Sequence, residues 1–217
     1  CPELHGYTTW NSATHEIPER VILKNNIFPT MFQLLRDAQP EAEIGCIYEW
    51  DGIKYVIDTL STSYQEMVPP SKIYTDEMAK MSVKYIKEKK PVLGAFIFDN
   101  PDHVGHDAGH DTPEYFANLK ELDEYIGQII QATKDAGIYE NCIFIVTSDH
   151  GGIDHGHGGK TLEEINTPFI IAGKGIKKDG EFQESMMQFD CAPTVLEIFG
   201  LEGPQVWVGR SMSQVFE

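Results

Sequence analysis

The sequence predicts an α/β fold in which a mostly parallel sheet is sandwiched by helices. Two runs, VLGAFIFD at 92–99 and CIFIVTS at 142–148, are continuously apolar up to the polar residues at their C-terminal ends. Such runs are typical of strands covered on both faces in parallel sheets. Segments with helical periodicity alternate with these strands. A length of 217 residues, with 41% hydrophobic and 24% charged residues, fits a single globular domain covering 1–217.

The N-terminal part contains one helix and one strand by these criteria. Residues 1–20 are rich in turn formers and are expected to form a surface loop. Segment 29–38 has apolar residues at helical spacing, and 43–50 fits the strand that follows it. Residues 51–74 mix Gly, Ser, Thr and two adjacent prolines, which indicates a loop or a small excursion.

Two helices flank the first apolar strand. Thr75 is a suitable N-cap, two acidic residues follow it, and the helix is expected to end at Pro91. The second helix begins at Thr112, which precedes a proline at the first helical position, and its apolar periodicity closes at Gly137. The second apolar strand comes next.

The C-terminal part continues the alternation. Thr161 and Glu164 fit a capping box at the start of a short helix. Segment 168–173 is expected to be a third strand, and 192–200 a helix with proline in its first turn and glycine at its end. We find no internal repeat and no sign of a domain boundary.

Six of the eight histidines lie in two glycine-rich segments, DNPDHVGHDAGH at 99–110 and SDHGGIDHGHGG at 148–159. Each segment follows the C-terminal end of a predicted strand, where open α/β sheets bind their ligands. Imidazole nitrogen together with carboxylate oxygen suits zinc better than magnesium or calcium. The sequence therefore predicts a metal site assembled from the two segments.

Within these segments, Asp102 and His106 are four residues apart and can fold back on one ion, whereas the adjacent Asp149 and His150 suit a ligand pair leaving a strand. Three further histidines could donate hydrogen bonds to ligands, but a solvated position is favoured for them because the ligand number is already met. These histidines are His103, His110 and His155.

The charge balance limits the partners. Lys and Arg number 17 against 34 Asp and Glu, a net charge of −17, which opposes binding of a nucleic-acid polymer. A small anionic ester would have to be attracted by bound cations. No apolar run reaches the ~18 residues of a membrane span, and the four cysteines form no C-x-x-C pair. The sequence does not indicate an oligomeric state.

The location in the cell is left open by the sequence. The segment that begins at Cys1 has no signal peptide. If an export signal lies upstream, a periplasmic or secreted location is expected.

Four motifs occur in a fixed order, PDHVGHDAGH, SDHGG, GHGGKT and DCAPTVLEIFG. Together they resemble the alkaline phosphatase superfamily, and within it the nucleotide pyrophosphatase/phosphodiesterase branch, over roughly residues 1–20 and 92–200. The resemblance implies that one zinc ion is held by Asp102, His106 and His157, and a second by Asp149 and His150.

In that branch the second zinc also takes an aspartate and a threonine or serine nucleophile, both upstream of a P-E-x-H-G segment. Here that segment is PELHG at 2–6. The resemblance therefore implies an N-terminally truncated domain whose nucleophile lies upstream of Cys1. It also implies two zinc ions in the intact enzyme, but one ion and no activity in this fragment. Trp10 stands where the branch has a phosphate-contacting asparagine, and Asn11 follows one place later.

The activity implied is hydrolysis of phosphate esters, most closely of the phosphodiesterase type, by two-zinc in-line displacement. A sulfatase-type ester hydrolase is the alternative within the superfamily, although neither Cys1 nor Cys191 begins the C-x-P-x-R motif that sulfatases need. Phosphoglycerate mutases share some motifs, but the P-D-x-x-G-H motif favours the phosphodiesterase branch. A non-catalytic metal-binding fragment is the alternative of a different class.

Overall fold

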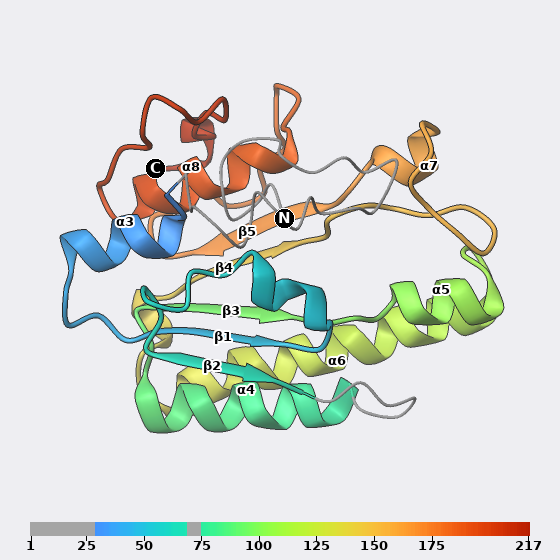
Figure 1. The fold of residues 1–217 in the computed structure, drawn as a ribbon, viewed down its shortest axis with the longest axis horizontal. Helices are drawn as coiled ribbons and strands as arrows, with labels where there is room; N and C mark the ends of the chain where they lie inside the picture. Colours follow the sequence, from blue (N-terminus) through green and yellow to red (C-terminus); the bar gives the residue numbers. More distant parts are fainter. Residues whose placement is uncertain (1–28, 69–74) are drawn as a thin grey trace.

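The computed structural model describes residues 29–68 and 75–217 (Figure 1). The predictions made for residues 1–20, including the PELHG segment, lie outside the described residues. The helices are α3 (Met31–Ala38), α4 (Thr75–Lys89), α5 (Asp102–Ala108), α6 (Pro113–Asp135), α7 (Leu162–Ile165) and α8 (Cys191–Ile198). The strands are β1 (Ile44–Tyr48), β2 (Tyr64–Met67), β3 (Leu93–Ile97), β4 (Ile143–Thr147) and β5 (Phe169–Gly173). Short 3₁₀ turns occupy η1 (Asp51–Tyr55), η2 (Tyr139–Asn141), η3 (Gln188–Asp190) and η4 (Ser213–Val215).

The strands form two sheets. β2, β1 and β3 form a parallel sheet with β1 in the centre, and all five residues of β1 are buried. β4 and β5 pair antiparallel and form a separate sheet among the described residues. The predicted α/β architecture with a parallel sheet is confirmed, and the last strand runs against its neighbour.

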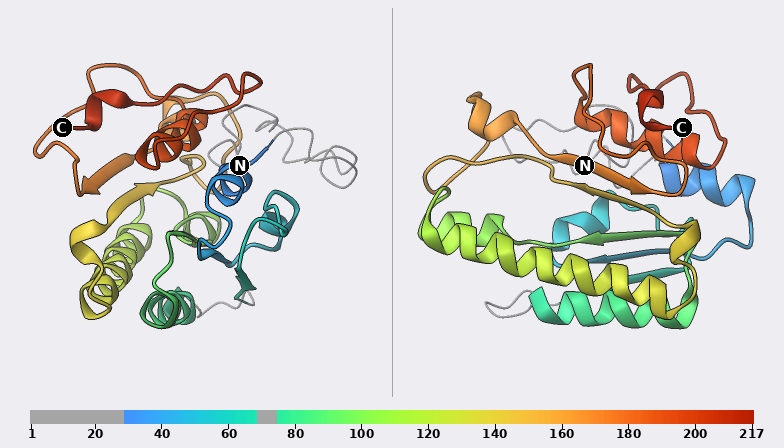
Figure 2. Two further views of the ribbon diagram at one scale, coloured as in Figure 1. Left: turned by 90° about the vertical axis from the view of Figure 1, so that its left-hand side faces the viewer. Right: turned by 180° about the vertical axis from the view of Figure 1, so that it is seen from behind.

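Helices cover both sides of the parallel sheet (Figures 1 and 2). α4 and α6 lie side by side on one face, where Met78 of α4 packs against Ile47 of β1 and Ile129 of α6 packs against Ile86 of α4. On the other side, α3 and α8 share the largest apolar cluster with β1, the 3₁₀ turn η1 and Trp207. The sheet is thus the middle layer of three.

Some strands differ from what their sequences suggest. The segment 51–74 was expected to form a loop or a small excursion, and within it the structure contains η1 and the strand β2, which was not predicted. β2 has the sequence YQEM and is only half-buried, so it carries no apolar run to mark it. Conversely, the apolar strands β3 and β4 are half-buried, because among the described residues each has a strand neighbour on one side alone.

The helix ends agree closely with the local sequence. The Thr112 hydroxyl accepts a hydrogen bond from the Tyr115 N–H at 3.2 Å, and Pro113 occupies the first turn of α6. Just past the end of α6, Gly137 has a φ of 72°, a conformation that glycine adopts without a Cβ penalty. Throughout 29–68 and 75–217, no helix combines the length and the apolar character that crossing a membrane requires.

Candidate metal centre

Most of the first histidine segment folds into a helix, α5. α5 starts shortly after β3 and places Asp102 and His106 on successive turns of one helix face. His106 Nε2 lies 3.2 Å from Asp102 Oδ2. The four-residue spacing thus brings both side chains to one point, as the sequence predicts.

His157 of the second segment reaches the same point. Its Nε2 lies 3.1 Å from His106 Nε2 and 3.5 Å from Asp102 Oδ1. The three potential ligand atoms all lie within 4.8 Å of one another. The His157 side chain is 8% exposed and that of His106 45%, so the group opens to solvent on one side.

These three side chains fit a tetrahedral metal ion. A zinc ion bonded at about 2.0–2.1 Å to each ligand separates neighbouring ligand atoms by roughly 3.3 Å, close to the distances found here. In addition, Asp102 Oδ1 is buried and accepts no hydrogen bond from the described residues. A buried carboxylate oxygen that accepts no hydrogen bond is costly, and a bound cation would offset that cost.

The orientation of His106 also suits a metal ligand. Its Nδ1 lies 2.9 Å from the carbonyl oxygen of His155. Since a carbonyl oxygen only accepts, this hydrogen bond requires a proton on Nδ1 and leaves the lone pair of Nε2 free for a cation. Metal-binding histidines commonly donate their second ring nitrogen in this way.

Asp149 and His150, the predicted second pair, lie beside this group without joining it. The His150 ring stacks on that of His157, with ring centroids 3.7 Å apart and planes 19° apart. His150 Nε2 lies 3.6 Å from Asp149 Oδ2, and the Asp149 side chain is 57% exposed. Among the described residues, the pair is not part of a group of three potential ligands.

A capping box fixes the second segment behind its histidines. The Glu164 carboxylate accepts hydrogen bonds from the Thr161 hydroxyl at 2.8 Å and from the Gly159 N–H at 2.7 Å, and the Glu164 carbonyl accepts from the Gly151 N–H. The Thr161 hydroxyl and the Gly159 N–H together lower the pKa of Glu164. Glu164 of α7 therefore holds the second histidine segment near both of its ends, at Gly151 and at Gly159.

Two acidic residues at strand ends were missed from the sequence. Glu49, 5% exposed, follows β1, and its Oε2 accepts the N–H of Asp99 at 2.7 Å. Burial raises the pKa of both carboxyl groups, and the charges of Asp102 and Asp149 raise that of Asp99 further. Their positions at the C-terminal ends of β1 and β3 were the signal available.

The remaining histidines of the two segments differ in their surroundings. His103 is exposed and lies 3.6 Å from Asp107, as expected of a solvated residue. His155 is also exposed, and its Nδ1 lies 3.1 Å from the His106 carbonyl. The solvated position expected for His110 is wrong, because its side chain is 6% exposed.

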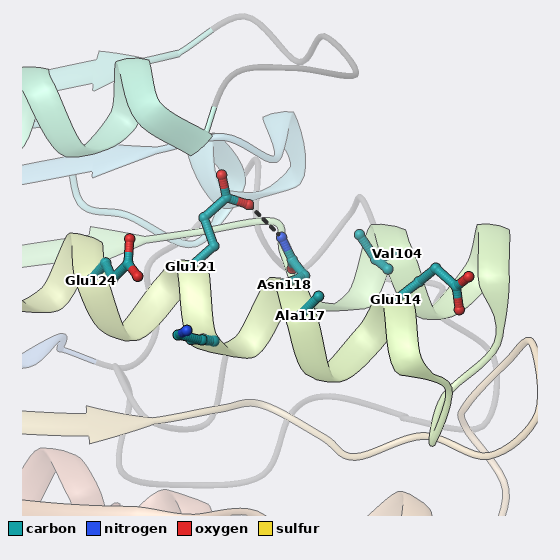
Figure 3. A pocket seen from close by; sticks show the side chains of 7 residues that line it. Val104, Glu114, Ala117, Asn118, Glu121 and Glu124 are labelled. Carbon is teal, nitrogen blue, oxygen red and sulfur yellow. Dashed lines mark hydrogen bonds between the residues drawn. The ribbon is translucent and has the colours of Figure 1, made fainter.

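A pocket between α5 and α6 does not suit an anionic ligand. It is lined by Val104 of α5 and by side chains of α6, and the carboxylates of Glu114, Glu121 and Glu124 point in different directions around it (Figure 3). The Asn118 amide donates to Glu121 at 3.2 Å. The lining contains three glutamates and one lysine, Lys120, so its net charge is negative and repels an anion. The metal centre is therefore the better candidate for a functional site.

Comparison with known proteins identifies the family of the chain. Residues 19–187 match the family described as type I phosphodiesterase / nucleotide pyrophosphatase. The chain belongs to this family. The resemblance to the alkaline phosphatase superfamily is thereby confirmed.

The relatives of this phosphodiesterase-family chain include proteins named for different activities. It is 27% identical over 175 residues to the 2,3-bisphosphoglycerate-independent phosphoglycerate mutase of Acetivibrio thermocellus, which covers 78% of this chain and 32% of the relative. It is 29% identical over 103 residues to the human ectonucleotide pyrophosphatase/phosphodiesterase family member 5, covering 47% and 21%. The chain thus spans a third or less of the length of these relatives.

A solved structure shows the same fold. A protein in complex with its substrate D-glucosamine-2-N,6-O-disulfate superposes with a TM-score of 0.74 at 14% identity, covering 100% of this chain and 69% of the other. At that identity the likeness concerns the fold alone. It confirms the α/β architecture of this member of the phosphodiesterase family.

Proposed function

We propose that the protein is a metal-dependent hydrolase of phosphate esters, of the phosphodiesterase or nucleotide pyrophosphatase type. Asp102, His106 and His157 would hold one zinc ion, and Asp149 and His150 would contribute to a second. The observation that supports this most strongly is the convergence of three ligand atoms from two segments some fifty residues apart. Family membership favours phosphate esters over other substrates.

A zinc ion held by Asp102, His106 and His157 would supply Lewis-acid chemistry to a phosphate ester. Contacts within the chain hold the histidine ligands in place. The His155 carbonyl fixes the ring of His106, and the ring of His157 lies against that of His150. A cation here would also offset the net charge of −17 near an anionic ester.

The remaining parts of the reaction come from the resemblance alone. In the branch that the sequence resembles, a threonine or serine nucleophile and a further aspartate complete the second site, and we assign neither to a residue of this sequence. With one complete group of three ligands among the described residues, we expect one tightly bound ion per 217-residue chain. An extracytoplasmic location remains part of the same proposal.

Metal binding can be tested without any assay of activity. Chelator-washed protein should take up one Zn²⁺ per chain, measured by mass spectrometry of the native protein. At free zinc 100-fold above Kd, the free energy of unfolding should rise by about 2.7 kcal/mol. Asp102→Ala and His106→Ala should lose both effects, while His103→Ala, on the same helix but exposed, should keep them.

Other results of the zinc-uptake measurement would contradict or change the proposal. Absence of zinc uptake by the wild-type chain would contradict the proposed metal centre. Two tightly held ions would mean that Asp149 and His150 find further ligands. Equal uptake by wild type and by His106→Ala would place the ion elsewhere.

The reaction is tested on the protein expressed from its complete reading frame. We expect zinc-dependent hydrolysis of bis(p-nitrophenyl) phosphate to exceed that of p-nitrophenyl phosphate and p-nitrophenyl sulfate, and Asp102→Ala to lower kcat/KM at least about 100-fold. Preferential turnover of the sulfate ester would identify the sulfatase alternative. Zinc binding with no turnover of any ester would favour a structural role for the metal.

A further inference from the structure

His110 ends the first histidine segment and is enclosed where the two segments meet. A Cβ atom added at Gly105 of α5 would overlap the His110 ring, and so would one added at Gly152 of the second segment. The ring also packs on Tyr115, with centroids 5.2 Å apart. The imidazole thus fills the space between α5 and the second segment, and glycine on both sides leaves room for it.

His110 is also hydrogen-bonded across the two segments. Its backbone N–H donates to the Asp154 carbonyl at 2.6 Å, and its Nδ1 lies 3.0 Å from the same oxygen. Because a carbonyl oxygen only accepts, Nδ1 must carry the proton. Nε2, at the opposite side of the ring, lies 3.9 Å from Asp102 Oδ1.

The distances separate His110 from the ligands themselves. Its Nε2 is not among the atoms that lie within 4.8 Å of one another in Asp102, His106 and His157. A distance of 3.9 Å to Asp102 is also too long for a hydrogen bond. The His110 ring therefore contacts both α5 and the second segment, which carry the three ligands, but is not itself a ligand in this arrangement.

We propose that His110 is a positioning residue of the metal centre, which holds α5 against the second segment so that Asp102 and His106 meet His157. This proposal rests on the proposed zinc site. Residues that orient metal ligands from outside typically contribute about 10–100-fold to metal affinity. His110 would do so by steric fit and by its bonds to Asp154.

The test compares zinc affinities, measured by competition with a chromogenic chelator, and the visible absorption spectra of the Co²⁺-loaded proteins. His110→Ala should weaken zinc binding about 10–100-fold and change the Co²⁺ spectrum. His110→Asn retains a donor near the position of Nδ1 and should lose less. His103→Ala is the matched control and should bind as the wild type does.

A double substitution tests the fit between ring and glycine. Gly152→Ala should weaken zinc binding, because its Cβ needs the space of the imidazole. In the His110→Ala background the same change should have little effect, since the space is free. Equal losses from Gly152→Ala in both backgrounds would overturn the proposal.

Folding of each variant is followed by thermal unfolding in excess chelator. A His110→Ala protein that unfolds at a lower temperature but binds zinc with wild-type affinity and an unchanged Co²⁺ spectrum would show a structural role only, and would overturn the positioning role while leaving the zinc site intact. Absence of zinc binding by the wild type would overturn both.

Discussion

At the scale of single residues, Glu49 is a buried acidic side chain that positions the backbone just after β3. Glu49 is 5% exposed, and its carboxylate accepts the N–H of Asp99, the first residue of the segment that carries Asp102. Burial is the main cause that raises the pKa of Glu49. The interaction with the Asp99 N–H acts in the opposite direction. Glu49 thereby fixes the point at which the chain leaves β3.

Substitutions at Glu49 should separate the charge from the hydrogen bond. Glu49→Ala should lower the free energy of unfolding by about 1–3 kcal/mol, because it leaves the partly buried N–H of Asp99 without its acceptor. Glu49→Gln keeps an acceptor and removes the buried charge. Urea unfolding at pH 7 in excess chelator is the measurement.

The pH dependence gives a second check on Glu49. A raised folded-state pKa means that ionisation costs stability as the pH rises above the ordinary value of 4.5. The Glu49→Gln protein should therefore gain stability relative to the wild type between acid and neutral pH. The exposed Glu41 is the control site, where the change to Gln should have no comparable effect.

At the scale of elements, local capping signals and long-range contacts differ in what the sequence reveals. The caps at Thr112 and Thr161 were predicted because their partners lie three residues away. The burial of His110 was not, because Gly152 and Asp154 are more than forty residues distant. β2 was missed for a similar reason, since its pairing with β1 outweighs a weak local preference.

The same distinction applies to the candidate site. The ligand types and the spacing of Asp102 and His106 can be read from the sequence, since one helical turn joins them. The choice of His157 over His155 as their partner came from the resemblance to the superfamily, and the structure is consistent with it. No local pattern distinguishes these two histidines.

The capping box of α7 makes a pH prediction. The pKa of Glu164 is lowered, first by the Thr161 hydroxyl, so its stabilising effect is fully present above the ordinary value of 4.5 and is lost as the pH falls through the lower folded-state value. The melting temperature of the wild type should exceed that of Glu164→Gln at pH 7. The difference should disappear in the acid range.

Thermal unfolding from pH 7 to pH 3 in excess chelator measures this difference. Glu163→Gln, on the same turn but exposed, should show no such trend. A difference for Glu164→Gln that stays constant over the whole range would mean that the shape of the side chain matters rather than its charge.

At the scale of the whole molecule, the largest apolar cluster joins α3, β1 and α8, which are far apart in the sequence. Phe32 and Leu196 are both completely buried in it. This cluster lies between the parallel sheet and the helices α3 and α8, which are on the side of the sheet opposite to α4 and α6 (Figure 2). Its integrity should therefore decide the global stability.

Leu196→Ala should lower the free energy of unfolding by about 2–5 kcal/mol, through lost burial and the cavity left behind. Leu60→Ala is the matched control, because Leu60 is 92% exposed and its truncation should change stability by less than about 0.5 kcal/mol. Urea unfolding followed by circular dichroism measures both. A small loss for Leu196→Ala would show that the cluster repacks around the change.

The separation of the strands into two sheets has a mechanical consequence. Among the described residues, β3 and β4 share no strand pairing, yet His106 follows the first of them and His157 the second. An ion bound between these histidines would therefore cross-link the two sheets. Its removal with a chelator should make local opening of both sheets more frequent, and faster amide hydrogen exchange along β3 and β4 would detect that opening.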